Sequence, residues 1–235
     1  ISGVSSNYRH ALPQRPKWYA CACCPPNVAR LVASFGKYAY GEKGDTIYCH
    51  MFADGSVSFE NGAELVCETE YPYDFTVKYT VKKGENKTLA VRIPEWSIKY
   101  ELFLNGNKLS LRTENGYLYL DVKSGDEIVL SMDGTPRFVY PSARIHSLTG
   151  KAAVMRGPLV YCFEGRDNEG DVLSLSLKDG ELLSLSQLDA EPLAGVTGIT
   201  ASAVRENVLQ ELYTDKKPET HDCEARAIPY YTWGN

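Results

Sequence analysis

The chain has 235 residues, 43% of them hydrophobic, and a formal net charge of −5 with acidic and basic residues well mixed. This is enough to bury the core of one large or two small domains, and the mixed charge argues against nucleic-acid binding, which needs a concentrated basic face. No apolar run reaches the roughly 18 residues that a membrane-spanning helix requires, so neither nucleic acid nor membrane is an expected partner.

The first 20 residues are polar and irregular, contain Pro13 and Pro16, and are predicted to form a surface loop. The chain begins at Ile1 rather than at a methionine and stops abruptly after the letters YYTWGN. We therefore expect it to be a piece of a longer protein.

Three cysteines follow within four residues, in the stretch YACACCPPNVAR. They are Cys21, Cys23 and Cys24, and two prolines come directly after them. Neighbouring cysteines are poorly placed for a disulfide, because the bond needs a suitable Cα separation and aligned Cβ vectors. The cluster therefore indicates metal binding, nucleophilic chemistry or inert thiols.

Residues 25–36, PPNVARLVASFG, are predicted to be the one substantial helix. Val28, Leu31, Val32 and Phe35 share the spacing of a single apolar stripe. Proline is tolerated in a first turn, and Gly36 is a natural stop. A helix N-terminus favours an anion, so a cysteine there is more available as a thiolate nucleophile or metal ligand.

A structural zinc site usually takes four ligands from two separated pairs. This chain has one cysteine cluster, and the other candidates have no diagnostic spacing; they are His10, Cys49, His50 and His221. From the residues alone, a structural zinc site, a catalytic thiolate and an inert cluster all stay open.

From about Tyr38 the apolar period changes to two, and short strands alternate with turns such as Asn105-Gly106, Asn115-Gly116 and Asp133-Gly134. This spacing is typical of sandwiches or barrels. A second strand-rich block begins near Ile145, and the segment around Pro141 is the expected boundary. The polar letters EGRDNEGD form a predicted loop inside that block.

The remaining cysteines are scattered through strand-like sequence, where a single cysteine is usually a small buried hydrophobic residue; they are Cys49, Cys67, Cys162 and Cys223. An odd total of seven favours a reducing compartment, and we expect the cytoplasm. Trp96 is expected to pack in a core or domain interface. Trp18 and Tyr19 are candidates for sugar stacking as much as for packing.

The sequence around the cysteine cluster resembles sequences of glycoside hydrolase family 127, the β-L-arabinofuranosidase-like enzymes. The stretch ACACCPPNVARLVASFG resembles the segment that closes their catalytic barrel. The later stretches VRIPEWS, LFLNGNKL, RGPLVYCFEG and AIPYYTWGN resemble their C-terminal β-regions, in the same order. The resemblance spans Trp18 to the end of the chain.

The resemblance implies a mainly β chain with two β-sandwich (jelly-roll-like) domains, preceded by the last loop and helix of an (α/α)6 barrel whose bulk is missing. Residues 1–38 would be the barrel remnant, 39–140 the first sandwich and 141–235 the second.

The resemblance also implies a retaining glycosidase. Cys23 would be the nucleophile, and Cys23 and Cys24 would both contact zinc. The remaining zinc ligands and the general acid/base would lie upstream, and Cys21 has no assigned role. We therefore expect zinc in the full-length parent, little or none in this piece, and an inactive fragment.

The expected partner is a carbohydrate, an arabinofuranoside or related glycan, and the sequence leaves a homo-oligomer open. Two other functions compete with the glycosidase. One is a non-catalytic carbohydrate-binding or scaffolding β-sandwich module, and the other is a structural zinc module. Fold alone does not separate them, since sandwiches host many functions.

Overall fold

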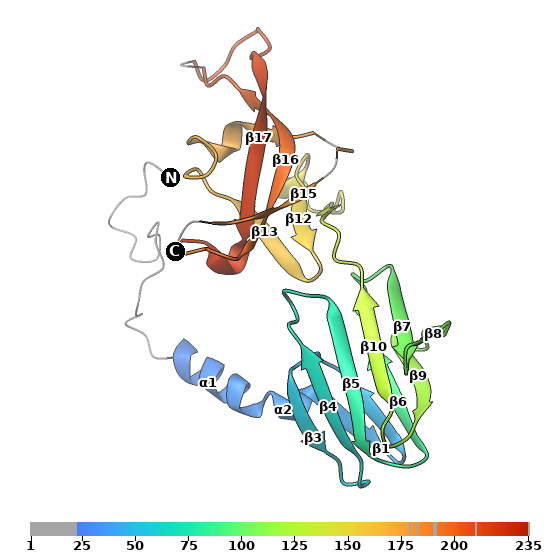
Figure 1. The fold of residues 1–235 in the computed structure, drawn as a ribbon. Helices are drawn as coiled ribbons and strands as arrows, with labels where there is room; N and C mark the ends of the chain where they lie inside the picture. Colours follow the sequence, from blue (N-terminus) through green and yellow to red (C-terminus); the bar gives the residue numbers. More distant parts are fainter. Residues whose placement is uncertain (1–22, 179, 182, 190–191, 210, 235) are drawn as a thin grey trace. The chain divides into compact units, whose positions relative to one another are not determined.

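The computed structural model describes residues 23–178, 180–181, 183–189, 192–209 and 211–234 (Figure 1). Its described residues form two compact units that divide between Gly134 and Thr135. Nearly all regular structure is β, so the mainly β expectation is confirmed. The expected surface loop over the first 20 residues lies outside the described residues.

The chain enters the first unit through two helices, α1 (Cys24–Ser34) and α2 (Gly36–Ala39). The helix predicted for residues 25–36 is therefore present, but its hydrogen bonding breaks at Phe35, whose N–H donates to the carbonyl of Val32 at 3.2 Å. An i→i−3 bond of this kind tightens the last turn. Gly36 thus follows the end of α1 and begins the short α2.

The first unit is a sandwich of two sheets. The four-stranded sheet has the order β1 (Tyr40–Lys43), β2 (Thr46–Cys49), β6 (Lys87–Arg92) and β9 (Tyr117–Val122). The six-stranded sheet has the order β3 (Gly55–Ser58), β4 (Glu64–Thr69), β5 (Thr76–Lys83), β10 (Glu127–Met132), β7 (Tyr100–Leu104) and β8 (Asn107–Leu109).

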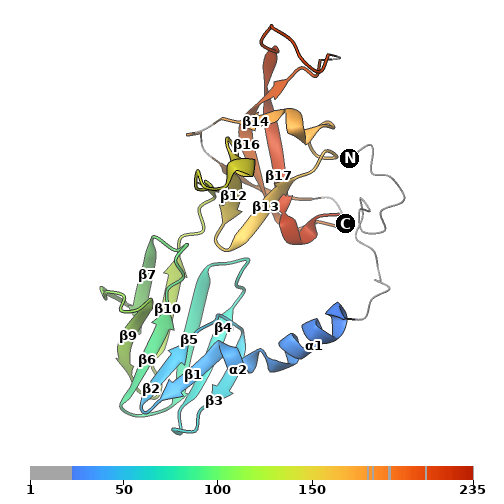
Figure 2. The same ribbon diagram turned by 180° about the vertical axis from the view of Figure 1, so that it is seen from behind.

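Side chains from both sheets interleave in one buried core. On β5 the alternate residues Val77, Tyr79 and Val81 point inward, and each is at most 1% exposed. Leu89 and Leu118 from the other sheet belong to the same cluster. The period of two in the sequence therefore specifies which face of each strand is buried, and the two sheets lie face to face (Figures 1 and 2).

Asn-Gly pairs make the tight turns that the sequence predicts. Asn105 and Gly106 both have positive φ, at 50° and 77°, and they join β7 to β8. Two successive positive φ values are what a two-residue hairpin turn needs to match strand twist. Gly134 differs, because it follows β10 in extended chain, and a side chain there would collide with the ring of Phe75.

The second unit is built on one sheet of seven strands. They are β11 (Arg137–Val139), β12 (Ala153–Arg156), β13 (Leu159–Phe163), β14 (Leu175–Leu177), β15 (Ser184–Gln187), β16 (Thr197–Glu206) and β17 (Thr220–Pro229). Three short 3₁₀ turns accompany them: η1 (His146–Leu148), η2 (Val172–Ser174) and η3 (Tyr230–Thr232). Hydrogen bonds join these strands into one continuous sheet.

The long antiparallel strands β16 and β17 pair at the centre of this sheet, and β14 and β15 both form hydrogen bonds with β16. β11 pairs with β12, which brings residues 137–139 into the second unit. The two units divide between Gly134 and Thr135, and the sequence places the expected boundary around Pro141. Within the described residues, the structure has no helix that is both long and apolar enough to cross a membrane.

Candidate active site

Cys23 and Cys24 lie where the sequence places them, at the start of α1. Cys23 is the residue before the helix and Cys24 is its first residue. The two prolines that follow occupy the first turn, where fixed φ suits the helix and a missing N–H costs little. The side-chain amide of Asn27 donates to the carbonyl of Cys23 at 2.8 Å and ties down this helix end.

The two sulfur atoms, Cys23 Sγ and Cys24 Sγ, are 3.6 Å apart, and both residues are exposed. None of the six described cysteines forms a disulfide. The structure therefore presents two adjacent thiols at one exposed place, which suits either a shared metal or an attack on a substrate.

The apolar stripe of α1 is also exposed. Val28, Leu31 and Val32 are 60%, 55% and 70% exposed, and no residue of α1 is buried. A stripe at this spacing normally faces a core. No described residue covers this apolar face of the helix, whose first turn carries the two thiols.

Within the described residues, no further metal ligand lies beside Cys23 and Cys24. Among the described residues, no three histidine, cysteine, aspartate or glutamate side chains gather in a way that could hold a metal ion. His10, Trp18, Tyr19 and Cys21 lie outside the described residues. The partners considered from the sequence, Cys49 and His50, serve other roles.

Cys49 and Cys67 are buried in the sandwich core, at 0% and 1% exposed. Burial raises the pKa of both thiols above the ordinary cysteine range, because the charged form loses its hydration. The expectation of small buried hydrophobic residues is confirmed for these two. Cys162 and Cys223 are only half-buried.

The other candidate ligands and stacking residues are held in structural contacts. His50 Nδ1 lies 2.7 Å from the hydroxyl of Tyr117. Trp96 stacks on Tyr71 with 6.4 Å between ring centroids, contacts Phe75, and packs against the sandwich core. The packing expectation for Trp96 is therefore confirmed.

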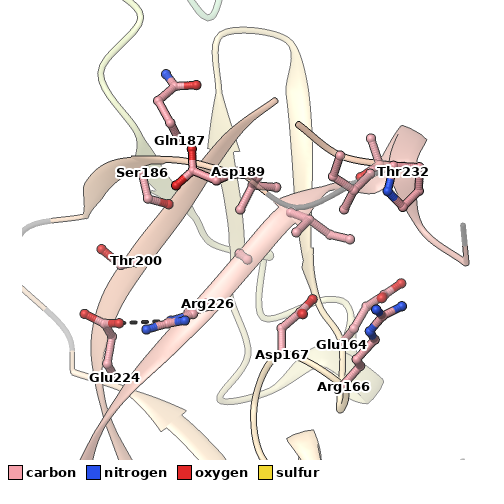
Figure 3. Close-up of a pocket in the computed structure, with 15 residues that line it drawn as sticks. Glu164, Arg166, Asp167, Ser186, Gln187, Asp189, Thr200, Glu224, Arg226 and Thr232 are labelled. Atoms are coloured by element: carbon pink, nitrogen blue, oxygen red, sulfur yellow. Dashed lines mark hydrogen bonds and ion pairs between the residues drawn. The ribbon is translucent and has the colours of Figure 1, made fainter. Parts of the chain in front are cut away.

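A pocket that sequence patterns did not identify lies within the second unit (Figure 3). It has a volume of about 620 Å³. Figure 3 shows Ser186, Gln187 and Asp189 on one side, and Glu164, Arg166 and Asp167 on another. The pocket floor adds apolar side chains from three segments, among them Leu188, Leu193 and Ile228.

The sequence gives little indication of this pocket. The letters EGRDNEGD indicate only a polar loop, and the residues that this loop contacts lie far away in the chain. Asn168, for example, forms hydrogen bonds with Arg226, 58 residues later. Asn168 is the one residue of the loop that stands out in the structure, since it is polar and only 2% exposed.

Comparisons with known proteins agree along most of the chain. The glycoside hydrolase family 127 C-terminal domain matches residues 136–235, and the β-L-arabinofuranosidase family 127 middle domain matches residues 46–134. A non-reducing end β-L-arabinofuranosidase from Bifidobacterium longum subsp. longum is 38% identical in an alignment 243 positions long, which covers 96% of this chain and 37% of that protein.

Solved structures give the same result. A family 127 β-L-arabinofuranosidase from Geobacillus stearothermophilus T6 has a TM-score of 0.86 at 34% identity and covers 98% of this chain. A family 127 β-arabinofuranosidase has a TM-score of 0.83 at 28% identity and covers 94% of it. The chain spans 38% of each of these two structures and 37% of the curated relative.

Proposed function

The chain belongs to glycoside hydrolase family 127, and from this premise we propose that the whole protein is a retaining β-L-arabinofuranosidase with Cys23 as its nucleophile. The chain corresponds to the C-terminal portion of the family. The relative from Bifidobacterium longum carries the name of a non-reducing end β-L-arabinofuranosidase, and this gives the proposed substrate class.

In the proposed reaction the Cys23 thiolate attacks the anomeric carbon of the bound sugar. The glycosidic C–O bond breaks, and a general acid outside this chain protonates the departing oxygen. Water then displaces the sulfur and gives a proton to the same group, which the first step left deprotonated; the sulfur leaves as the thiolate, and the sugar is released with its original anomeric configuration. Retaining enzymes normally use a carboxylate for this attack, and here a thiolate takes that place.

The spacing of the two thiols fits a shared zinc ion. Two thiolates with bonds of about 2.3 Å to one tetrahedral zinc would have sulfur atoms about 3.8 Å apart. The observed Cys23 Sγ–Cys24 Sγ distance is 3.6 Å. When bound there, zinc would keep both sulfurs deprotonated. We assign Cys23 and Cys24 two of the four ligand positions and leave the other two to residues outside this chain.

The exposed stripe of α1 supports the same proposal. Val28, Leu31 and Val32 face solvent in this chain, whereas the relatives are more than twice as long as the region they share with it. We propose that in the whole protein these side chains pack against the remaining domain, as the last helix of its barrel. That contact would enclose the two thiols and exclude water from the attack.

The thiol pair at the exposed start of α1 is the observation that carries this function. A sandwich that only bound carbohydrate or acted as a scaffold would not need it. The direct test is an activity screen of the whole protein on paired aryl β- and α-L-arabinofuranosides. Turnover of the β anomer alone would support the proposal, and no turnover of either would contradict it.

A further inference from the structure

The pocket of the second unit is lined by a loop that the fold holds rigidly. The side-chain amide of Asn168 donates to the carbonyls of Glu164 and Arg226, each at 2.8 Å, and its oxygen accepts the Arg226 N–H at 2.8 Å. Arg205 also donates to the Asn168 carbonyl. One buried side chain thus ties the loop to β17, and a rigid loop loses little freedom when a ligand binds.

The two ends of the loop at residues 165–170 are held close together. The Gly170 N–H donates to the Gly165 carbonyl at 2.8 Å, and any side chain at Gly165 would collide with the Gly170 carbonyl. Gly170 itself has φ of 114°, which favours glycine. These constraints hold the neighbouring side chains of Arg166 and Asp167 at the pocket wall.

Several polar groups of the pocket remain available for a ligand. Glu224 pairs with Arg226 at 3.1 Å, and Glu164 accepts the Gly234 N–H at 3.0 Å. By contrast, the side chains of Arg166, Asp167 and Asp189 make no hydrogen bond or ion pair with other described residues. Ser186 and Thr200 add hydroxyl groups to this set of available donors and acceptors, whereas the Gln187 amide already donates to the Thr197 hydroxyl at 3.4 Å.

The balance of charge selects among ligand classes. The lining has four carboxylates, on Glu164, Asp167, Asp189 and Glu224, against two guanidinium groups, on Arg166 and Arg226. This excess of negative charge disfavours an anionic ligand. A metal cation is disfavoured too, because no ligand group of three forms among the described residues.

A neutral ligand rich in hydroxyl groups suits a lining that presents both charges. Each hydroxyl both donates and accepts, so it can bind carboxylates and guanidinium groups side by side. The apolar side chains of Leu188, Leu193 and Ile228 offer a surface for the C–H face of a ring. Small-molecule sites combine an apolar surface with convergent polar groups, and this lining provides both, with the polar residues in the majority.

We propose that this pocket is a saccharide-binding site that takes neutral arabinofuranosides. The choice of sugar rests on the proposed function, while the pocket itself is lined only by residues of the second unit. Neither Cys23 nor Cys24 lines it, so binding here does not require the nucleophile.

The test is an NMR titration of the uniformly ¹⁵N-labelled 235-residue chain with methyl β-L-arabinofuranoside, up to about 50 mM because single-ring ligands bind weakly. Saturable shifts should gather at the amides of residues 164–170, 186–189 and 224–228. Glycerol at equal concentration is the control for unspecific polyol contact. No saturable shift with the glycoside, or the same pattern with glycerol, would overturn the proposal.

Two matched variants sharpen the result. Asp167→Asn removes an available carboxylate and should weaken binding by about tenfold, while the spectrum shows whether the fold is kept. Asp215→Asn changes an exposed carboxylate elsewhere in the same unit and should bind as the wild type does. Equal affinity in wild type and Asp167→Asn, with the fold intact, would contradict the site.

The outcome can be separated from that of the proposed function. Turnover of β-L-arabinofuranosides by the whole protein without binding at this pocket would overturn only the saccharide site. Binding at the pocket without turnover would overturn only the proposed hydrolysis.

Discussion

Cys23 Sγ and Cys24 Sγ lie 3.6 Å apart at the exposed first turn of α1. The separation results from the local backbone, because adjacent residues at a helix start place their side chains on neighbouring parts of the surface. The two prolines after them hold that turn in helical geometry. The pair is therefore already in place in this chain, even though the described residues leave the apolar face of α1 uncovered.

We predict that the 235-residue chain binds zinc weakly or not at all. Cys23 and Cys24 supply two thiols, and among the described residues no third ligand joins them, whereas a stable site takes four. Metal analysis after dialysis against a mild chelator measures this. Zinc retained at one ion per chain would mean that a complete site exists here, and the structural zinc function would gain support.

Thiol alkylation should divide the described cysteines into two groups. Cys23 and Cys24 are exposed, whereas burial shields Cys49 and Cys67 and raises the pKa of their thiols. Because the thiolate is the reactive form, iodoacetamide at about pH 8 should label the exposed pair much faster. Peptide mass spectrometry over time reads out each site. Equal rates for Cys49 and Cys23 in the folded chain would contradict the structure.

Asn168→Ala should destabilise the second unit. The substitution leaves the backbone groups of Glu164 and Arg226 without partners in a buried place, and losses of this kind add up to about 2–3 kcal/mol. Urea unfolding followed by NMR signals of the second unit gives the free energy. The control is Asn207→Ala, an exposed asparagine, which should change it by less than about 0.5 kcal/mol. Similar values for the two variants would refute the role of Asn168.

Two buried tyrosines should respond differently to loss of the hydroxyl. The Tyr161 hydroxyl donates to the Thr197 carbonyl at 3.0 Å, so Tyr161→Phe should lower the free energy of unfolding of its unit by about 1 kcal/mol. The Tyr79 hydroxyl is buried and makes no hydrogen bond of ordinary geometry with other described residues; the thiols of Cys49 and Cys67 lie near it. Thiols are weak hydrogen-bonding groups, so Tyr79→Phe should be nearly neutral.

The comparison is made for each unit separately, since a chain with two compact units need not unfold in one step. A loss at Tyr79→Phe as large as that at Tyr161→Phe would show that the thiols bind this hydroxyl more strongly than the structure indicates.

Local patterns predict much of this fold. The inward alternation of Val77, Tyr79 and Val81 gives a strand, and Asn105-Gly106 gives a hairpin turn, because both depend only on near neighbours. Pairing between distant segments is different. β2 and β6 run parallel in the four-stranded sheet, and no local signal distinguishes that partner from any other strand.

The same limit applies to the sites. The start of α1 and its cysteines follow from prolines, cysteines and helix periodicity within a dozen residues. The pocket of the second unit does not, because Asp167 and Arg226, which both line it, come from segments far apart in the chain. Likewise, the pairing of β11 with β12, which joins residues 137–139 to the second unit, leaves no local signal near Pro141.

The most direct test of the Cys23 mechanism uses the whole protein and a mechanism-based arabinofuranosyl electrophile, followed by peptide mass spectrometry. We predict one label per chain on Cys23, and neither label nor appreciable turnover in Cys23→Ser. A serine hydroxyl is similar in size, so the fold should be kept, but it ionises far less readily than a thiol and is a poor nucleophile near neutral pH. A label on a carboxylate instead, or near-normal turnover in Cys23→Ser, would contradict the thiolate mechanism.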